Sequence, residues 1–179
     1  MSTIHTTFRE AAVLVPVYRD AAGDLQLVLV RRGDFGVHGG QLAFPGGKRD
    51  PDDNSLLSTA LRETEEEIHL PPTSVEVLTQ LPAVSTNASG FRVTPFLGRI
   101  TRPAEEWRWM EHEIAEVLEV SVRHLADPAT HGEELVQFPN WPDPQQIAFY
   151  RVGEYRLWGL SYRIIRPLIA PLLAGKWDI

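Results

Sequence analysis

One stretch constrains the fold of this chain more than any other, the run from Phe44 to Leu70. It opens with Pro-Gly-Gly, which predicts a turn, and it continues through a segment, Asp50 to Ser55, that is rich in turn formers and N-cap residues. A helix is therefore expected to begin near Asn54 or Ser55. At 100° per residue this helix has one mostly apolar stripe, which predicts that it packs on a core. The stripe consists of Leu57, Ala60, Leu61, Thr64 and Ile68.

The same helix has an acidic face beside the apolar stripe. Glu63, Glu66 and Glu67 fall at i, i+3 and i+4, so their carboxylates are expected within reach of each other, while Glu65 faces solvent. Like charges at these spacings repel by a few tenths of a kcal/mol per pair. A hard divalent cation with oxygen ligands offsets that repulsion, and a Gly-Gly turn leaves backbone carbonyls open to the same ion. The pattern predicts a site for Mg²⁺ or Mn²⁺, against the ordinary alternative of a surface helix rich in glutamate.

Gly47, followed after the turn-rich segment by the run from Arg62 to Leu70, resembles the Nudix box. In that motif a glycine precedes a glutamate by six positions, and Arg-Glu-x-x-Glu-Glu follows on the helix. Two departures resemble the coenzyme A pyrophosphatase branch of the family: Asp53 replaces the first glutamate, and eight residues rather than seven separate it from Arg62. A third departure, His69 in place of a late glycine, is expected to affect only how the helix ends.

The resemblance implies a role for each of these residues. Glu63 and Glu67 would be the principal metal ligands, and Glu66 would be a ligand or hold metal-bound water. Gly47 would offer its carbonyl, and Arg62 would orient the carboxylates through a bidentate contact. The predicted catalytic residues are thus Glu63, Glu66 and Arg62, and the predicted metal ligands are Gly47, Glu63, Glu66 and Glu67.

A glycine-rich loop, Arg32 to Gln41, lies between a predicted strand and the box. Such a loop either approaches a ligand closely or is a flexible connection. Arg31 and His38 resemble part of the motif that precedes the box in coenzyme A pyrophosphatases, whereas Arg32 and Gly36 depart from that motif. We predict Arg31, Arg32 and His38 as substrate contacts, although a histidine in a loop is more often only hydrogen-bonded.

Two glutamates later in the chain are further candidates. In the wider Nudix family an acidic residue from a later loop often assists the metal or the attacking water, and the resemblance offers Glu113 or Glu116 for that role. The ordinary alternative is that both are simply solvated.

The composition of the chain restricts the classes of molecule that it can bind. The chain of 179 residues has 17 basic and 24 acidic residues, a net charge of −7, and no long basic run, which argues against binding duplex nucleic acid. A small nucleotide substrate remains compatible, because cations can neutralise its site locally. There is no cysteine, so disulfides and Cys-ligated zinc are excluded. No signal pattern or membrane-spanning run is evident, so we expect a cytoplasmic protein without a membrane partner. The oligomeric state stays open, with a homodimer as one option.

Strands dominate the rest of the pattern. They are expected at residues 11–18, 25–31, 75–81, 91–100, 134–138 and 146–151, the first two as a hairpin and the fourth with Pro95 at an edge or bulge. A short helix is expected at residues 121–126, and a helical tail at 157–174 that Pro167 and Pro171 kink or split. The residues alone indicate strands with two helices. The resemblance implies one α+β domain over residues 1–179, a Nudix-type α/β/α sandwich with a mixed, curved central sheet.

Three functions are compatible with this reading. The first is a metal-dependent hydrolase that cuts the diphosphate of coenzyme A or its derivatives to 3′,5′-ADP and 4′-phosphopantetheine. The second is a Nudix pyrophosphatase for another substrate, such as ADP-ribose, NADH or a nucleoside triphosphate, which the departure at Gly36 keeps open. The third is a Nudix fold used only for binding, against which the intact Glu63, Glu66 and Glu67 argue.

Overall fold

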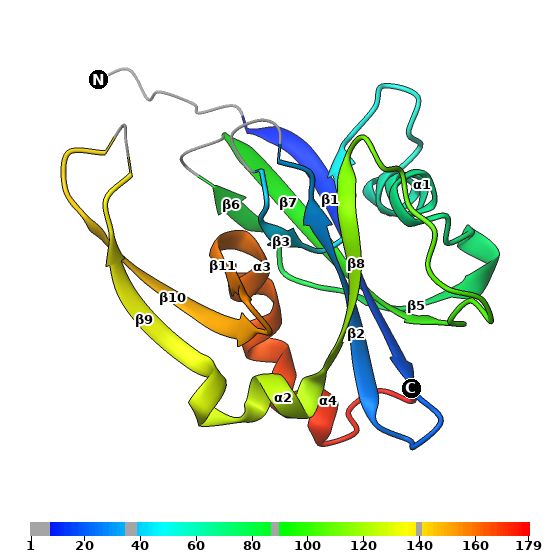
Figure 1. The fold of residues 1–179 in the computed structure, drawn as a ribbon. Helices are drawn as coiled ribbons and strands as arrows, with labels where there is room; N and C mark the ends of the chain where they lie inside the picture. Colours follow the sequence, from blue (N-terminus) through cyan, green and yellow to red (C-terminus); the bar gives the residue numbers. More distant parts are fainter. Residues whose placement is uncertain (1–7, 35–38, 87–89, 139–140) are drawn as a thin grey trace. The chain divides into compact units, whose positions relative to one another are not determined.

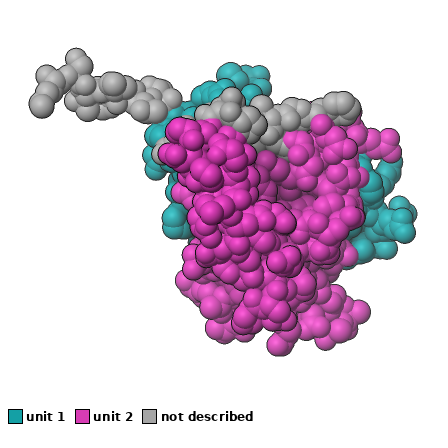
Figure 2. Space-filling model, turned by 60° about the vertical axis from the view of Figure 1, so that its left-hand side comes forward, with its two compact units in different colours: residues 1–16, 44–110 teal, residues 17–43, 111–179 magenta. Residues whose placement is uncertain are grey.

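The structure, a computed structural model, describes residues 8–34, 39–86, 90–138 and 141–179 (Figure 1). The chain divides into two compact units: unit 1 from residues 1–16 and 44–110, and unit 2 from residues 17–43 and 111–179 (Figure 2). Strand β1, Arg9–Arg19, contributes to both units, and it is buried from Ala11 to Tyr18 because its sequence is almost continuously apolar. The single domain expected over residues 1–179 stays a prediction.

Unit 1 contains the helix of the acidic stretch and the strands around it. Here β1 pairs antiparallel with β4 and lies beside β7, which itself pairs antiparallel with β5 and β6. After β1, the elements of unit 1 are β4 Gly46–Lys48, α1 Leu56–Ile68, the 3-10 helix η1 Pro72–Ser74, β5 Val75–Gln80, β6 Val84–Thr86 and β7 Phe91–Ile100.

Two neighbouring glycines of the box lie in a strand rather than in the predicted Pro-Gly-Gly turn. Gly46 and Gly47 pair with Val13 and Ala12 of β1, so the segment is extended. Gly46 has a φ of 149°, and a side chain there would meet the backbone of Ala12 and Val13 at 2.3 and 2.6 Å. Glycine at position 46 is therefore required by the close approach of β1 and β4.

Pro95 lies in β7 where the neighbouring strand changes. On that side β7 pairs with β6 from Phe91 to Val93 and with β5 from Phe96 to Ile100. Between them, the Pro95 carbonyl accepts the N–H of Leu81 at 2.9 Å. Because proline has no N–H to donate, the interval between two partner strands tolerates it. The expected edge position is wrong, since β7 lies between β1 and β5.

Unit 2 contains two groups of strands followed by short helices. The end of β1 pairs antiparallel with β2, as the predicted hairpin requires, and β2 also pairs with β3 and β8. A separate three-stranded sheet has the order β11-β10-β9. The elements of unit 2 are β2 Leu25–Arg32, β3 Leu42–Ala43, β8 Ile114–Ser121, α2 Val122–Ala126, η2 Pro128–Thr130, β9 His131–Val136, β10 Gln145–Val152, β11 Tyr155–Trp158, α3 Gly159–Ile165, η3 Arg166–Leu168 and α4 Ile169–Leu173.

The tail is less helical than its composition suggests. Leu157, expected to begin a helix, lies in β11 opposite Tyr150, and the helical part is divided by the 3-10 turn that contains Pro167. The predicted division at a proline is thus confirmed, whereas Pro171 lies inside α4. Among the described residues no helix combines the length and the apolar character needed to cross a membrane.

The fold is α+β, with a large mixed sheet and few helices, and the predicted fold class is confirmed. Strand β7 has the predicted bounds, and β1, β2, β5, β9 and β10 lie within a few residues of theirs. Strands β3, β4, β6, β8 and β11 were not expected. Three of them have only two or three residues, too few for a period of two to be visible in the sequence.

Candidate active site

Helix α1 begins and ends where the sequence indicates. Ser55 is the N-cap: its hydroxyl accepts the N–H of Ser58 at 3.0 Å, and its own N–H donates to the Ser58 hydroxyl at 2.9 Å. This reciprocal capping stabilises the first turn. At the other end His69 adopts the left-handed conformation, with φ at 53°, and its N–H donates to the Glu65 carbonyl at 3.0 Å. His69 therefore occupies a C-cap at which glycine is usual.

The buried face of α1 is rotated from the predicted stripe. Ala60, Thr64 and Ile68 are buried as expected, whereas Leu57 and Leu61 are only half-buried. Thr59 and Glu67 are buried in their place. Each of these two polar side chains has a specific partner: the Thr59 hydroxyl donates to Asp53 at 2.8 Å, and Glu67 accepts the N–H of Gly46 at 2.9 Å. Apolar periodicity alone could not predict this rotation, because the polar contacts decide it.

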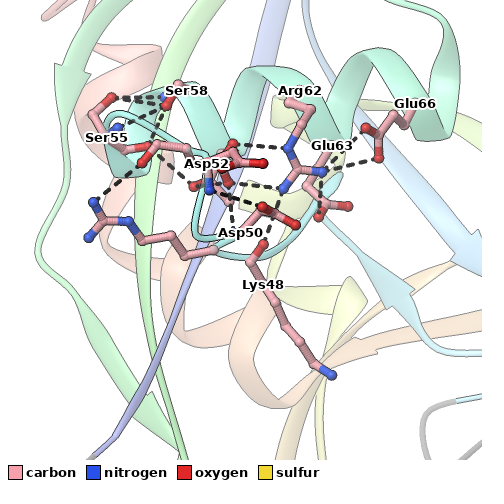
Figure 3. Close-up of polar contacts among 11 residues, drawn as sticks. Lys48, Asp50, Asp52, Ser55, Ser58, Arg62, Glu63 and Glu66 are labelled. Atoms are coloured by element: carbon pink, nitrogen blue, oxygen red, sulfur yellow. Dashed lines mark hydrogen bonds and ion pairs between the residues drawn. The ribbon is translucent and has the colours of Figure 1, made fainter.

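Arg62 is the centre of a polar network on α1, and Figure 3 shows its contacts with Glu63, Glu66 and Lys48. Its Nε and Nη2 donate to the two carboxylate oxygens of Asp53, each at 3.0 Å. Its Nη1 lies 3.1 Å from Glu63 and 3.2 Å from Glu66, and its Nη2 donates to the Lys48 carbonyl at 3.3 Å. The bidentate contact expected of Arg62 thus exists, and its partner is Asp53.

Asp53 is buried beneath this arginine. Besides Arg62, its carboxylate accepts the Asp50 N–H at 2.9 Å and the Thr59 hydroxyl. The hydrogen bonds from Arg62, followed by those from Asp50 and Thr59, hold the pKa of Asp53 well below its usual range despite the opposing effect of burial. In return, Asp53 raises the pKa of Arg62. In the sequence, Asp53 was noted only as a departure from the box, and its role in fixing Arg62 was not predicted. The spacing between Asp53 and Arg62 was the one sequence signal of this contact.

The three predicted metal ligands of α1 have different surroundings. Glu63 is 18% exposed, and a side chain at Gly47 would lie 2.4 Å from its carboxylate carbon, so the bare glycine makes room for that group. Glu67 is buried at 3% exposure, whereas the side chain of Glu66 is 48% exposed and turns to Arg62. Glu65 faces solvent, as expected.

These groups form a set of oxygen donors. Among the described residues no three His, Cys, Asp or Glu side chains are arranged to hold a metal ion. Glu66 accepts hydrogen bonds from Arg62, and Glu67 accepts one from Gly46. The chemistry of the set nevertheless fits a hard cation, which prefers carboxylate and carbonyl oxygen. The space that Gly47 leaves for the Glu63 carboxylate supports this fit.

A second cluster, in unit 2, brings together two of the predicted substrate residues. Nε of Arg31 lies 3.6 Å from Oε2 of Glu116, and Nη1 of Arg31 donates to Asp34 at 3.4 Å. The sequence did not indicate the fourth member, Tyr155 of β11. Its hydroxyl donates to Oε2 of Glu116 at 3.1 Å, and its ring centroid lies 5.4 Å from the Arg31 guanidinium. The hydrogen bond to Glu116 raises the pKa of Tyr155.

Arg32 and Glu113, two further predicted site residues, are not among the side chains of this cluster. Arg32 is half-buried and follows Arg31 at a register shift between β2 and β8. Glu113 is exposed, and its carbonyl accepts the N–H of Gly33 at 2.7 Å. His38 lies outside the described residues.

Comparison with known proteins agrees with this geometry. Residues 8–156 match the model of the NUDIX domain. The chain is 35% identical over 167 residues to the uncharacterized Nudix hydrolase NudL of Photorhabdus laumondii, covering 89% of this chain and 83% of that protein. It is 38% identical to NudL of Citrobacter koseri, covering 89% and 81%. In fold it is similar to RenU, a Nudix hydrolase of M. smegmatis, with a TM-score of 0.64, 17% identity, and coverage of 96% and 89%. The chain that carries the Arg62 network on α1 therefore belongs to the Nudix hydrolase family.

Proposed function

We propose that this protein is a divalent-metal-dependent hydrolase that cleaves the diphosphate of coenzyme A or its derivatives to 3′,5′-ADP and 4′-phosphopantetheine. The observation that carries the proposal is the pairing of Asp53 with Arg62. Aspartate with one extra residue before the arginine is the pattern that resembles the coenzyme A pyrophosphatase branch. All the oxygens and donors of this pair are engaged, so the departure from the general box is a built feature of the fold.

The residues of α1 and β4 that would hold the metal are Glu63, Glu66, Glu67 and Gly47. An ion held there, Mg²⁺ or Mn²⁺, would neutralise charge on the leaving phosphate and lower the pKa of a water molecule. The contribution of the chain is positioning. Arg62, itself fixed by Asp53, holds the Glu63 carboxylate, and the N–H of Gly46 holds Glu67. The exposed Glu66 is the group best able to reach an attacking water and orient it.

Arg31, Arg32 and His38 are the proposed contacts to the substrate. Coenzyme A has a 3′-phosphate that dephospho-coenzyme A lacks, and the planar fork of arginine can hold two oxygens of such a group. Arg31 favours this role because its guanidinium lies 5.4 Å from the centre of the Tyr155 ring while its side chain remains partly exposed, at 22%. Of the two candidates to assist the attacking water, Glu113 is favoured, because Glu116 is already paired.

A second candidate function is hydrolysis of another nucleotide, such as ADP-ribose, NADH or a nucleoside triphosphate. The observation that favours it is Gly36, which stands where the coenzyme A motif often has an arginine. A binding module without catalysis is the third reading, and the intact Glu63, Glu66 and Glu67 argue against it.

A substrate screen tests the proposal. The purified protein would be assayed with Mg²⁺ and with Mn²⁺ on coenzyme A, acetyl-coenzyme A, dephospho-coenzyme A, ADP-ribose, NADH and a nucleoside triphosphate, with products separated by chromatography. We expect coenzyme A or its thioester to have the highest kcat/KM, with 3′,5′-ADP released and turnover abolished by a chelator. A tenfold preference for ADP-ribose or NADH would overturn the proposed substrate, and no turnover on any of them would favour the binding module.

A further inference from the structure

The Arg31 cluster contains a buried hydrogen-bond donor that the protein leaves unsatisfied. Nε of Arg31 is inaccessible to solvent and has no hydrogen-bond partner among the described residues. The nearest carboxylate oxygen, Oε2 of Glu116, lies 3.6 Å away, beyond hydrogen-bond distance. An unmade hydrogen bond of a buried donor is unfavourable, so a specific feature must prevent the closer pairing of these two side chains.

That feature is Tyr155. Its hydroxyl donates at 3.1 Å to the same oxygen of Glu116 that Arg31 faces. Three strands bring these groups together: Arg31 comes from β2, Glu116 from the paired strand β8, and Tyr155 from β11 of the other sheet of unit 2. The Tyr155 ring lies 5.4 Å from the guanidinium and supports it through a cation–π contact. The hydroxyl thus holds Glu116 at a distance, while the ring holds Arg31 in place.

The other partner of Arg31 is weakly bound. Asp34 is three residues along the chain, its side chain is 81% exposed, and its contact with Nη1 measures 3.4 Å. An exposed pair of this kind is screened by water and contributes little. Arg31 is thus paired with two carboxylates, neither of them in close contact. A guanidinium with such loose partners suits exchange for an anion with several oxygens.

Resting on the proposed function, we propose that Tyr155 is a positioning residue for substrate selection. By engaging Glu116, its hydroxyl keeps the Arg31 guanidinium available to a phosphate monoester of the substrate, the 3′-phosphate in coenzyme A. Without the hydroxyl, Glu116 closes on the buried Nε of Arg31, and its charge then competes with that phosphate for the partly exposed guanidinium. Tyr155 acts through Glu116 and Arg31 and takes no part in cleavage of the diphosphate.

The test is a rescue experiment with the chain of 179 residues. Tyr155→Phe keeps the ring and removes the hydroxyl, so the ratio of kcat/KM for coenzyme A to that for dephospho-coenzyme A should fall about tenfold, through KM. Adding Glu116→Gln removes the competing charge, and the double variant should return to within about twofold of the ratio of Glu116→Gln alone. Tyr162→Phe is the matched control, because it removes a tyrosine hydroxyl of the same unit that contacts His131, and its ratio should not change.

Each outcome supports or overturns the proposed role of the Tyr155 hydroxyl. An unchanged ratio in Tyr155→Phe, an equal loss on both substrates, or a failure of Glu116→Gln to restore the ratio would overturn the role of Tyr155. Calorimetric binding of adenosine 3′,5′-bisphosphate against 5′-AMP gives the same comparison without turnover. Failure of the proposed function is visible separately, because the unaltered protein and Arg31→Ala would then not distinguish coenzyme A from dephospho-coenzyme A.

Discussion

The two arginine clusters differ in how completely their hydrogen bonds are made. Arg62 in unit 1 uses three nitrogens, forms a bidentate contact with a buried aspartate, and touches two glutamates and a carbonyl. Arg31 in unit 2 has one buried nitrogen without a hydrogen bond and two loose ion pairs. An arginine with close, complete contacts organises the groups around it, whereas one with loose ion pairs can exchange them for an external ligand. The first is therefore expected to affect stability and metal chemistry, and the second substrate choice.

The largest effect is expected from breaking the acidic face that Arg62 organises. Glu63→Gln or Glu67→Gln should lower kcat by at least about a hundredfold, because each removes charge from the proposed metal site. The free energy of unfolding should not fall, since glutamine keeps a hydrogen-bond acceptor and relieves repulsion among the glutamates. Glu65→Gln, on the exposed side of the helix, is the control and should leave turnover unchanged. Near-normal turnover in the Glu63→Gln/Glu67→Gln double variant would refute the assignment.

Removing the positive charges of Arg31 and Arg32 should lower kcat/KM mainly for coenzyme A. Arg31→Ala/Arg32→Ala should reduce kcat/KM for coenzyme A by about ten- to a hundredfold more than for dephospho-coenzyme A, because a charge-assisted contact to the 3′-phosphate contributes roughly 1.5–3 kcal/mol. The measurement is kcat/KM for both substrates with the unaltered and the double-variant proteins. Equal losses would mean that these arginines hold the diphosphate or the fold. Single variants would sharpen the comparison, since Arg31 is part of the cluster and Arg32 is not.

Breaking the pair of Asp53 and Arg62 should cost stability. Asp53→Asn should lower the free energy of unfolding by about 2 kcal/mol at neutral pH, less than for a fully buried ion pair because Arg62 is one-third exposed. The pKa of Asp53 is depressed in the folded state, so its contribution is present above the ordinary value of 3.8 and is lost as pH falls below it. Chemical unfolding at pH 7 and below pH 3 should therefore show a difference between the two proteins that shrinks in acid. A constant difference would contradict this.

The smallest effect is expected at the end of the same helix, where no ion pair is involved. His69 has a positive φ, a conformation that is unfavourable for a residue with a side chain. His69→Gly should raise the free energy of unfolding by about 0.5–1 kcal/mol without altering kcat. Thermal unfolding measures it, and a decrease in stability would show that the histidine side chain makes a compensating contact.

The sequence predicted the box helix, its N-cap and most long strands, because these depend on local patterns such as Ser55 before a periodic run. It did not predict that Thr59 and Glu67 are buried, because their partners Asp53 and Gly46 come from outside the helix. Tyr155 was missed for a similar reason. Its contact with Glu116 joins residues 39 positions apart, and no local spacing indicates such a pair. Motif comparison thus found the acidic groups of α1, and tertiary contacts define which of them are held in place.

The two adjacent glycines of β4 differ in which substitutions they can tolerate during evolution. A side chain at Gly46 would collide with the main chain of β1, which cannot yield, so every descendant that keeps this fold keeps that glycine. The three nearest atoms that a side chain at Gly47 would meet all belong to the Glu63 carboxylate group, at 2.4 to 2.6 Å. Replacement at position 47 is therefore open to lineages that have already lost the Glu63 carboxylate. A relative with a larger residue at position 47 and no carboxylate at position 63 would have kept the fold and lost the proposed metal site.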